Sequence, residues 1–148
     1  MTAPRPFARD GRGQSLVELA LILPIFLLLV TGLFDLARAV WQENTLAYAA
    51  REGTRYAIVH GSAAGDDAVY PGHAQPVVDT VKRAAIGVPG VAVTVSWPEM
   101  NGPTACYDRG CGVSVDASAP FVPLPSQYLL GGAFQITLRG GSALVIQR

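Results

Sequence analysis

The amino-acid sequence predicts an α+β protein in which a long N-terminal transmembrane and amphipathic helix packs on a small antiparallel β-sheet domain. Three features support this fold class: an uncharged apolar run, an amphipathic continuation of it, and short β-branched segments in the last third of the chain. These features divide the chain into a leader (1–13), a transmembrane helix (14–35), an amphipathic stem helix (36–59) and an extracytoplasmic α+β domain (60–148).

The apolar run has nearly the length of a membrane span. Sixteen residues without a charge separate Glu18 from Asp35. As a helix they would cover about 24 Å at about 1.5 Å per residue, slightly less than the ~30 Å hydrocarbon core of a bilayer. Adding Leu16 and Val17 brings the run into range if Glu18 and Asp35 lie at the interfaces or find partners. A buried helix of a soluble domain is the alternative, but such a run would leave it no polar face.

Basic residues predict the orientation of this span. Arg5, Arg9 and Arg12 precede it in a leader rich in proline and glycine, whereas only Arg38 follows it closely. This bias favours a cytoplasmic N-terminus, with the bulk of the chain outside.

We expect residues 14–59 to form one long helix. Pro24 lies inside the span, where it removes a backbone hydrogen bond and loosens the helix. Gly32, near the outer end, would permit the close approach of another helix. Both residues could equally be tolerated without a role. From Asp35 onward the pattern becomes amphipathic, so the helix is expected to leave the membrane and pack on a folded domain.

The start of the helix has the pattern of a class III signal segment: a small residue at a cut site, an acid five positions later, and an apolar helix. Gly13 and Glu18 supply the first two features. A structural alternative is a capping box formed by Ser15 and Glu18. The functional interpretation is that a carboxylate at the edge of the hydrocarbon is costly and needs a partner, for which a newly exposed amine would serve.

The outer domain is predicted to begin with a loop over 60–75, followed by a short helix over 77–86. Strands are expected over 91–97 and 112–118, because both segments alternate and are rich in β-branched residues. The polar residues of the loop are His60, Asp66, Asp67 and His73. Their spacing matches no metal-ligand pattern, so we expect solvated polar groups and no metal site.

The end of the chain is harder to predict. Residues 120–132 contain three prolines and several large apolar side chains, and an irregular connection that covers the core is expected. If exposed, this segment would form an adhesive apolar patch for a partner or a membrane. Two strands are predicted over 134–138 and 142–146, and the Gly140-Gly141 pair between them is either a bulge or a two-residue hairpin turn.

Cys106 and Cys111 are separated by four residues in a segment expected outside the cytoplasm. This setting favours a structural disulfide at the tip of a hairpin, with free or metal-bound thiols as the alternatives. Closing so short a loop should contribute only about 2 kcal/mol, because the entropic effect grows with loop length.

Composition and motifs exclude several function classes. The formal net charge is zero and 15% of the residues are charged, so there is no basic footprint for nucleic acid. The sequence contains no nucleophile elbow, phosphate loop or paired catalytic carboxylates. We therefore expect neither an enzyme nor a cofactor.

The segment from Gly13 to Ala57 resembles the N-terminal region of the TadE-like family, the minor pilins or pseudopilins of tight-adherence (Flp-type) pilus systems, which are related to type IV pili. The resemblance rests on Val17-Glu18, on Leu23-Pro24, and on the run from Ala49 to Ala57. It covers about 45 residues closely and the remainder only in outline.

This resemblance implies a pilin-like fold and a protein of the bacterial cytoplasmic membrane that supports pilus assembly. A prepilin peptidase would cut between Gly13 and Gln14, placing Glu18 at the fifth mature position. There it would meet the N-terminal amine of a neighbouring pilin or pseudopilin, and Pro24 and Gly32 would lie in helix-helix contacts. The amine of Gln14 can cyclise to pyroglutamate, which would remove its charge. The implied partners are the peptidase, other pilins and the assembly platform.

Two other hypotheses remain open. An uncleaved leader would leave a single-pass, membrane-anchored binding module without a role in pilus assembly. Alternatively, the small-x-small sequence of Ala37, Arg38 and Ala39 fits an ordinary leader-peptidase site, and a cut there would release a soluble exported domain.

Overall fold

The structure, a computed structural model, describes residues 12–98, 106–129, 131 and 134–147. Most of the predicted leader lies outside the described residues. The elements along the chain are α1 (Arg12–Val59), the 3₁₀ helix η1 (Ser62–Asp67), α2 (Gln75–Ala84), β1 (Ala92–Ser96), β2 (Gly112–Phe121), α3 (Leu124–Leu129) and β3 (Ile136–Val145). The predicted α+β fold class is confirmed.

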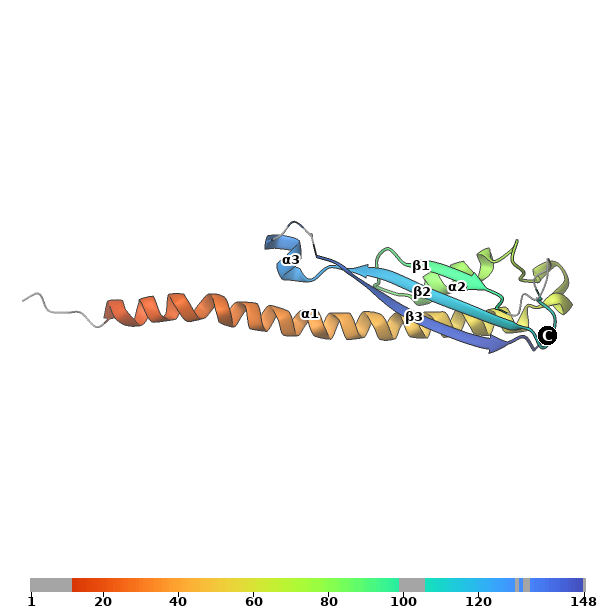
Figure 1. The fold of residues 1–148 in the computed structure, drawn as a ribbon, viewed down its shortest axis with the longest axis horizontal. Coiled ribbons are helices and arrows are strands. Elements are labelled where there is room, and N and C mark those ends of the chain that lie inside the picture. Colours follow the sequence, from red (N-terminus) through yellow and green to blue (C-terminus); the bar gives the residue numbers. More distant parts are fainter. Residues whose placement is uncertain (1–11, 99–105, 130, 132–133, 148) are drawn as a thin grey trace, which may run out of the picture.

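The helix α1 is a 48-residue rod that runs the length of the molecule (Figure 1). Its first half extends beyond the folded domain, and its second half lies along the sheet. The helix continues through Pro24, as the sequence predicts. It begins at Arg12, so Ser15 lies inside the helix and does not cap it, and the capping-box interpretation does not hold for this chain.

The three strands form an antiparallel sheet in the order β1-β2-β3. Helices α1 and α2 cover one face, and the other face is open to solvent, as the alternating burial along β2 shows. The central strand β2 is three residues longer than predicted. Pro120 fits within it because β1 pairs no further along β2 than Ser118, so that edge of β2 is free at Pro120.

The core lies between the second half of α1, the inner face of the sheet and α2. On α1 the core residues recur every three or four positions, which places them on one face of the helix. They are Leu46, Ala49, Ala50, Thr54 and Ala57. Val77 and Val81 of α2 are four residues apart, on one face of the helix, and both are fully buried. The small side chains on α1 let the sheet approach the helix closely.

The predicted break at Gly140-Gly141 is wrong. The strand β3 continues through both glycines, and each keeps its partner on β2, Ala117 and Asp116 respectively. Packing explains the glycine at position 140. A Cβ atom there would overlap the backbone of Leu46 and Ala47 on α1. Gly140 therefore lies where helix and sheet approach each other closely, and it does not mark a turn.

Two connections differ from their predictions. The segment 60–75 contains η1 and buries Val69, whose N–H donates to the carbonyl of His60 at 2.7 Å. The segment 120–132 is not an irregular cover of the core. It contains the end of β2 and then α3, which lies beside α1 at the end of the domain nearest the first half of that helix (Figure 1).

Candidate functional site: the exposed half of α1 and its junction with the outer domain

The first half of α1 exposes apolar side chains around its whole circumference. Residues 13–29 are all exposed, although most of them are large and apolar. This helix is long and apolar enough to cross a membrane, and none of its most apolar window is buried within the chain. A helix that is apolar on all sides and unburied requires an apolar environment. The described part of the chain does not provide one.

The predicted assembly residues lie on this exposed half. Gly13 and Gln14 are in the first turn and are exposed. No hydrogen bond or ion pair within the described part of the chain involves the carboxylate of Glu18. A Cβ atom added to Gly32 would meet nothing within 4 Å, so no intramolecular packing requires glycine there. Pro24 differs from these residues because it faces α3 across a groove.

At the end of the apolar run, Asp35 and Arg38 join α1 to the turn between β2 and α3. Arg38 Nη2 lies 3.2 Å from Asp35 Oδ1 and donates to the carbonyl of Val122 at 2.6 Å. The N–H of Leu124 donates to Asp35 Oδ2 at 2.7 Å. The Arg38 guanidinium also lies 4.8 Å from the centroid of the Phe121 ring. Asp35 thus has a partner. The length of the apolar run requires this of Asp35 if it does not lie at the membrane interface.

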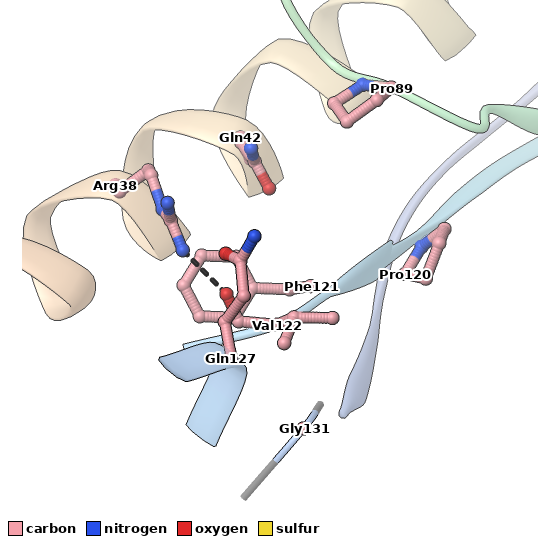
Figure 2. A pocket seen from close by; sticks show the side chains of 8 residues that line it. All are labelled: Arg38, Gln42, Pro89, Pro120, Phe121, Val122, Gln127 and Gly131. Atoms are coloured by element: carbon pink, nitrogen blue, oxygen red, sulfur yellow. Dashed lines mark hydrogen bonds between the residues drawn. The ribbon is translucent and has the colours of Figure 1, made fainter. Parts of the chain in front are cut away.

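A cavity of about 410 Å³ opens beside this junction. Figure 2 shows Arg38 and Gln42 projecting from α1 towards Phe121 and Val122. Within the described residues, neither Arg38 Nε nor Gln42 Oε1 has a hydrogen-bond partner, and both atoms are buried. Arg38 Nε can donate a hydrogen bond to a polar group in the cavity, and Gln42 Oε1 can accept one.

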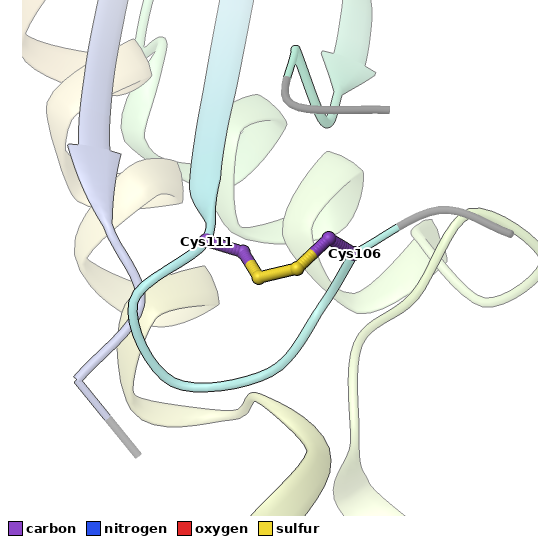
Figure 3. The surroundings of a disulfide bond; sticks show 2 residues. All are labelled: Cys106 and Cys111. Atoms are coloured by element: carbon purple, nitrogen blue, oxygen red, sulfur yellow. A yellow bond between two sulfur atoms is a disulfide. The ribbon is translucent and has the colours of Figure 1, made fainter. Parts of the chain in front are cut away.

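The cysteines and the polar loop lie at the opposite end of the domain. Cys106 and Cys111 form a disulfide, as predicted, in the loop that leads into β2 (Figure 3). Hydrogen bonds link this loop to the end of β3, because Gly110 N–H donates to Ile146 and Ile146 N–H donates to Cys111. The structure brings together no group of three or more His, Cys, Asp or Glu side chains that could hold a metal, as far as the described residues extend.

The two histidines have local structural contacts. The ring of His60 stacks on Tyr56 with centroids 4.0 Å apart, and its Nδ1 lies 2.8 Å from the Tyr56 carbonyl. The ring of His73 lies 5.7 Å from that of Tyr70. Each histidine thus contacts an aromatic neighbour.

Residues 13–55 match the family model of the TadE-like proteins. This match confirms the resemblance seen in the sequence, and we call these residues the TadE-like segment. No curated protein and no solved structure gives a significant match to the chain.

The TadE-like segment combines two different surfaces of α1. Its first part is the exposed apolar half of the helix, with Glu18 near its start. Its last part contains Ala49, Ala50 and Gly53, which are buried against the sheet and α2. A Cβ atom at Gly53 would overlap Val81 of α2. The alanine-rich end of the segment is therefore a close-packing surface inside this chain, whereas the side chains at its start are exposed among the described residues.

Sequence reasoning missed the role of Asp35 and Arg38. The two residues are three positions apart on a helix, and this spacing is the one feature of the sequence that indicates an ion pair between them. Their partners on the β2–α3 turn are 84 to 89 residues away along the chain. No local pattern indicates such a contact.

Replacing Asp35 with alanine should release α3 from α1. The substitution removes the acceptor of the Leu124 N–H and leaves Arg38 without its acidic partner, at an expected cost of about 1.5–3 kcal/mol. Hydrogen exchange of the full chain in detergent would measure this, with faster exchange expected over 122–129 and unchanged exchange in β2 and β3.

Glu52→Ala is the matched control for this substitution. Glu52 pairs with Arg55 at 3.4 Å on the same helix, but this pair is largely exposed, so its loss should have almost no effect. Unchanged exchange over 122–129 in the Asp35→Ala protein would show that the junction does not hold α3 in place.

Proposed function

We propose that this protein is a TadE-like minor pilin or pseudopilin, anchored in the bacterial cytoplasmic membrane and needed for the biogenesis of a Flp-type, tight-adherence pilus. The observation that carries the proposal is the TadE-like match over a helix whose first half is apolar on every side and unburied. That half of α1 is available to the bilayer and to the helices of other pilins. The outer domain, built on the second half of the same helix, would be held outside the membrane.

Two residues on the exposed half support an assembly role. The carboxylate of Glu18 has no partner among the described residues and lies near the start of an apolar helix, where an unpaired charge is unfavourable in lipid. An N-terminal amine of a neighbouring subunit would neutralise it. Gly32 has open space around it, which would let a second helix approach closely.

We further propose that a prepilin peptidase cuts between Gly13 and Gln14 on the cytoplasmic side. Arg5, Arg9 and Arg12 favour this orientation. The cut would remove the basic leader and create the amine that Glu18 needs, while the apolar helix stays in the membrane. Neither catalysis nor a cofactor has a place in this proposal.

The second candidate is a single-pass, membrane-anchored binding module with no role in pilus assembly. The cavity beside Arg38 and Gln42 favours it, because each contributes a buried polar atom that has no hydrogen-bond partner among the described residues and could bind a ligand. This module would need no cleavage at Gly13.

The mature N-terminus distinguishes these candidates. We would determine it by mass spectrometry of the membrane-associated protein, from cells with and without the prepilin peptidase. Mass spectrometry also detects a pyroglutamate at Gln14, which would block chemical sequencing. A chain that begins at Gln14 only when the peptidase is present is the expected result.

Two other results would contradict the proposal. A chain that begins at Met1 or Thr2 would leave a plain membrane anchor. One that begins near Val40 would mean that the apolar helix is an ordinary export signal, and the pilin proposal would be wrong.

A further inference from the structure

The connection between β2 and β3 carries no charged residue. We call residues 122–129 the α3 arm. It lies inside a longer uncharged stretch, since no Asp, Glu, Lys or Arg occurs between Asp116 and Arg139. Elsewhere in the outer domain the longest stretch without a charge is shorter, the 15 residues between Arg83 and Glu99. A long uncharged segment at one end of a domain is typical of contact with an apolar environment.

The α3 arm and the exposed half of α1 enclose an apolar groove. The groove has a volume of about 380 Å³, and its lining is almost entirely apolar. It is lined by Pro24, Leu27, Leu28, Thr31, Leu124, Pro125 and Tyr128. The Thr31 hydroxyl donates back to the carbonyl of Leu27 at 2.9 Å, which satisfies the one polar side chain on the α1 wall. Tyr128 itself is 78% exposed.

The groove lies at the depth of the outer leaflet if α1 spans the membrane. Along α1, Thr31 is four residues before Asp35 and Pro24 is eleven residues before it. At about 1.5 Å per residue these positions are about 6 Å and 16 Å below Asp35. Half of the hydrocarbon core is about 15 Å thick. With Asp35 at the membrane surface, the groove that α3 lines therefore lies in the outer half of the hydrocarbon core.

The root of the arm is adapted to this position. Asp35 and Arg38 neutralise each other there, and each has a hydrogen bond to the backbone of the arm, although Asp35 Oδ1 and Arg38 Nε have no hydrogen-bond partner among the described residues. A neutral, hydrogen-bonded pair lowers the cost of placing two charged side chains near lipid. Its backbone partners, the carbonyl of Val122 and the N–H of Leu124, are also satisfied, as an apolar environment requires.

We propose that the α3 arm is immersed in the outer leaflet of the membrane, and that lipid acyl chains fill the groove between α3 and α1. The protein thus has two membrane contacts, the span and the arm. This second contact fixes the tilt and rotation of the outer domain on the bilayer. The inference rests on the membrane anchoring of α1 in the proposed function.

Depth-dependent quenching of a fluorescent label would test this. The full chain, with its native disulfide intact, would be reconstituted in phosphatidylethanolamine and phosphatidylglycerol vesicles. A single cysteine labelled with NBD would be placed at Tyr128 in the arm. Two matched controls are Leu21→Cys in the span, and Tyr70→Cys, which is also exposed and contacts Tyr107 near the disulfide at the far end of the domain. Quenchers are doxyl lipids in the bilayer and iodide in the water.

We expect lipid-borne quenchers to act on the labels at 21 and 128 several-fold more strongly than on the label at 70, and iodide to act in the opposite order. If the label at 128 behaves like the one at 70 while lipid quenches the label at 21, the proposal that the α3 arm is immersed is wrong. The membrane anchoring of α1 is then still supported. A label at 128 protected from both quenchers would mean that protein fills the groove, which also contradicts the immersion of the arm. If lipid fails to quench even the label at 21, the membrane anchor itself is wrong.

Discussion

Replacing Glu18 with alanine is expected to abolish pilus assembly without preventing cleavage at Gly13. The carboxylate of Glu18 has no partner among the described residues, so its loss costs the single chain nothing. In an assembly it would remove the partner of a neighbouring N-terminal amine, at a depth where an unpaired charge costs up to about 2.5–3.5 kcal/mol. The stability of the outer domain should not change, because Glu18 forms no hydrogen bond or ion pair with the described residues of that domain.

Two readouts check this prediction: the number of pili on cells that carry the variant in place of the original protein, and the mass of the mature chain. Glu43→Ala is the matched control, since Glu43 is an exposed acid on the same helix beyond the span. It should leave both readouts unchanged. Normal pili in the Glu18→Ala cells would show that this carboxylate has no role in assembly, and loss of pili in both variants would point to a general effect of removing acids from α1.

Replacing Gly140 with valine should lower the free energy of unfolding of the outer domain by about 3 kcal/mol or more. Even the Cβ atom would overlap the backbone of Leu46 and Ala47, and backbone cannot move aside as the end of a flexible side chain can. Overpacking of a core commonly costs about 1–3 kcal/mol, and a clash with helix backbone belongs at the upper end of that range. The helix and the sheet would have to separate.

Chemical unfolding of the full chain in detergent would measure this change. Ala143→Val is the control, because Ala143 lies three residues further along β3 and is exposed. It should change the stability by less than about 0.5 kcal/mol. Equal stability of the two variants would mean that the helix and the sheet do not pack as closely as the structure shows.

The effect of Gly140 also shows where sequence reasoning reached its limit. Two adjacent glycines in a β-rich segment usually mark a turn or a bulge, and the sequence predicted one here. The actual reason for glycine at position 140 is a helix more than 90 residues earlier in the chain. A local pattern cannot distinguish a glycine that bends the chain from one that makes room for another element.

The sequence by itself determined the features whose causes are local. The uncharged run between Glu18 and Asp35, followed by an amphipathic stem, predicted the long helix. The alternation in 91–97 and 112–118 predicted two strands, and the spacing of the cysteines favoured the disulfide. In each case the residues that decide the structure are within a few turns or strand positions of one another, so their periodicity can be seen directly.

Only the tertiary structure decided how these elements meet. It placed β3 against α1 at Gly140, tied Asp35 and Arg38 to the β2–α3 turn, and laid α3 beside Pro24 in the apolar half of the helix. The contacts of Asp35 and Arg38 join residues 84 to 89 positions apart. Such contacts depend on how the whole domain folds back along α1. A local stretch of sequence does not indicate which distant residues it will contact.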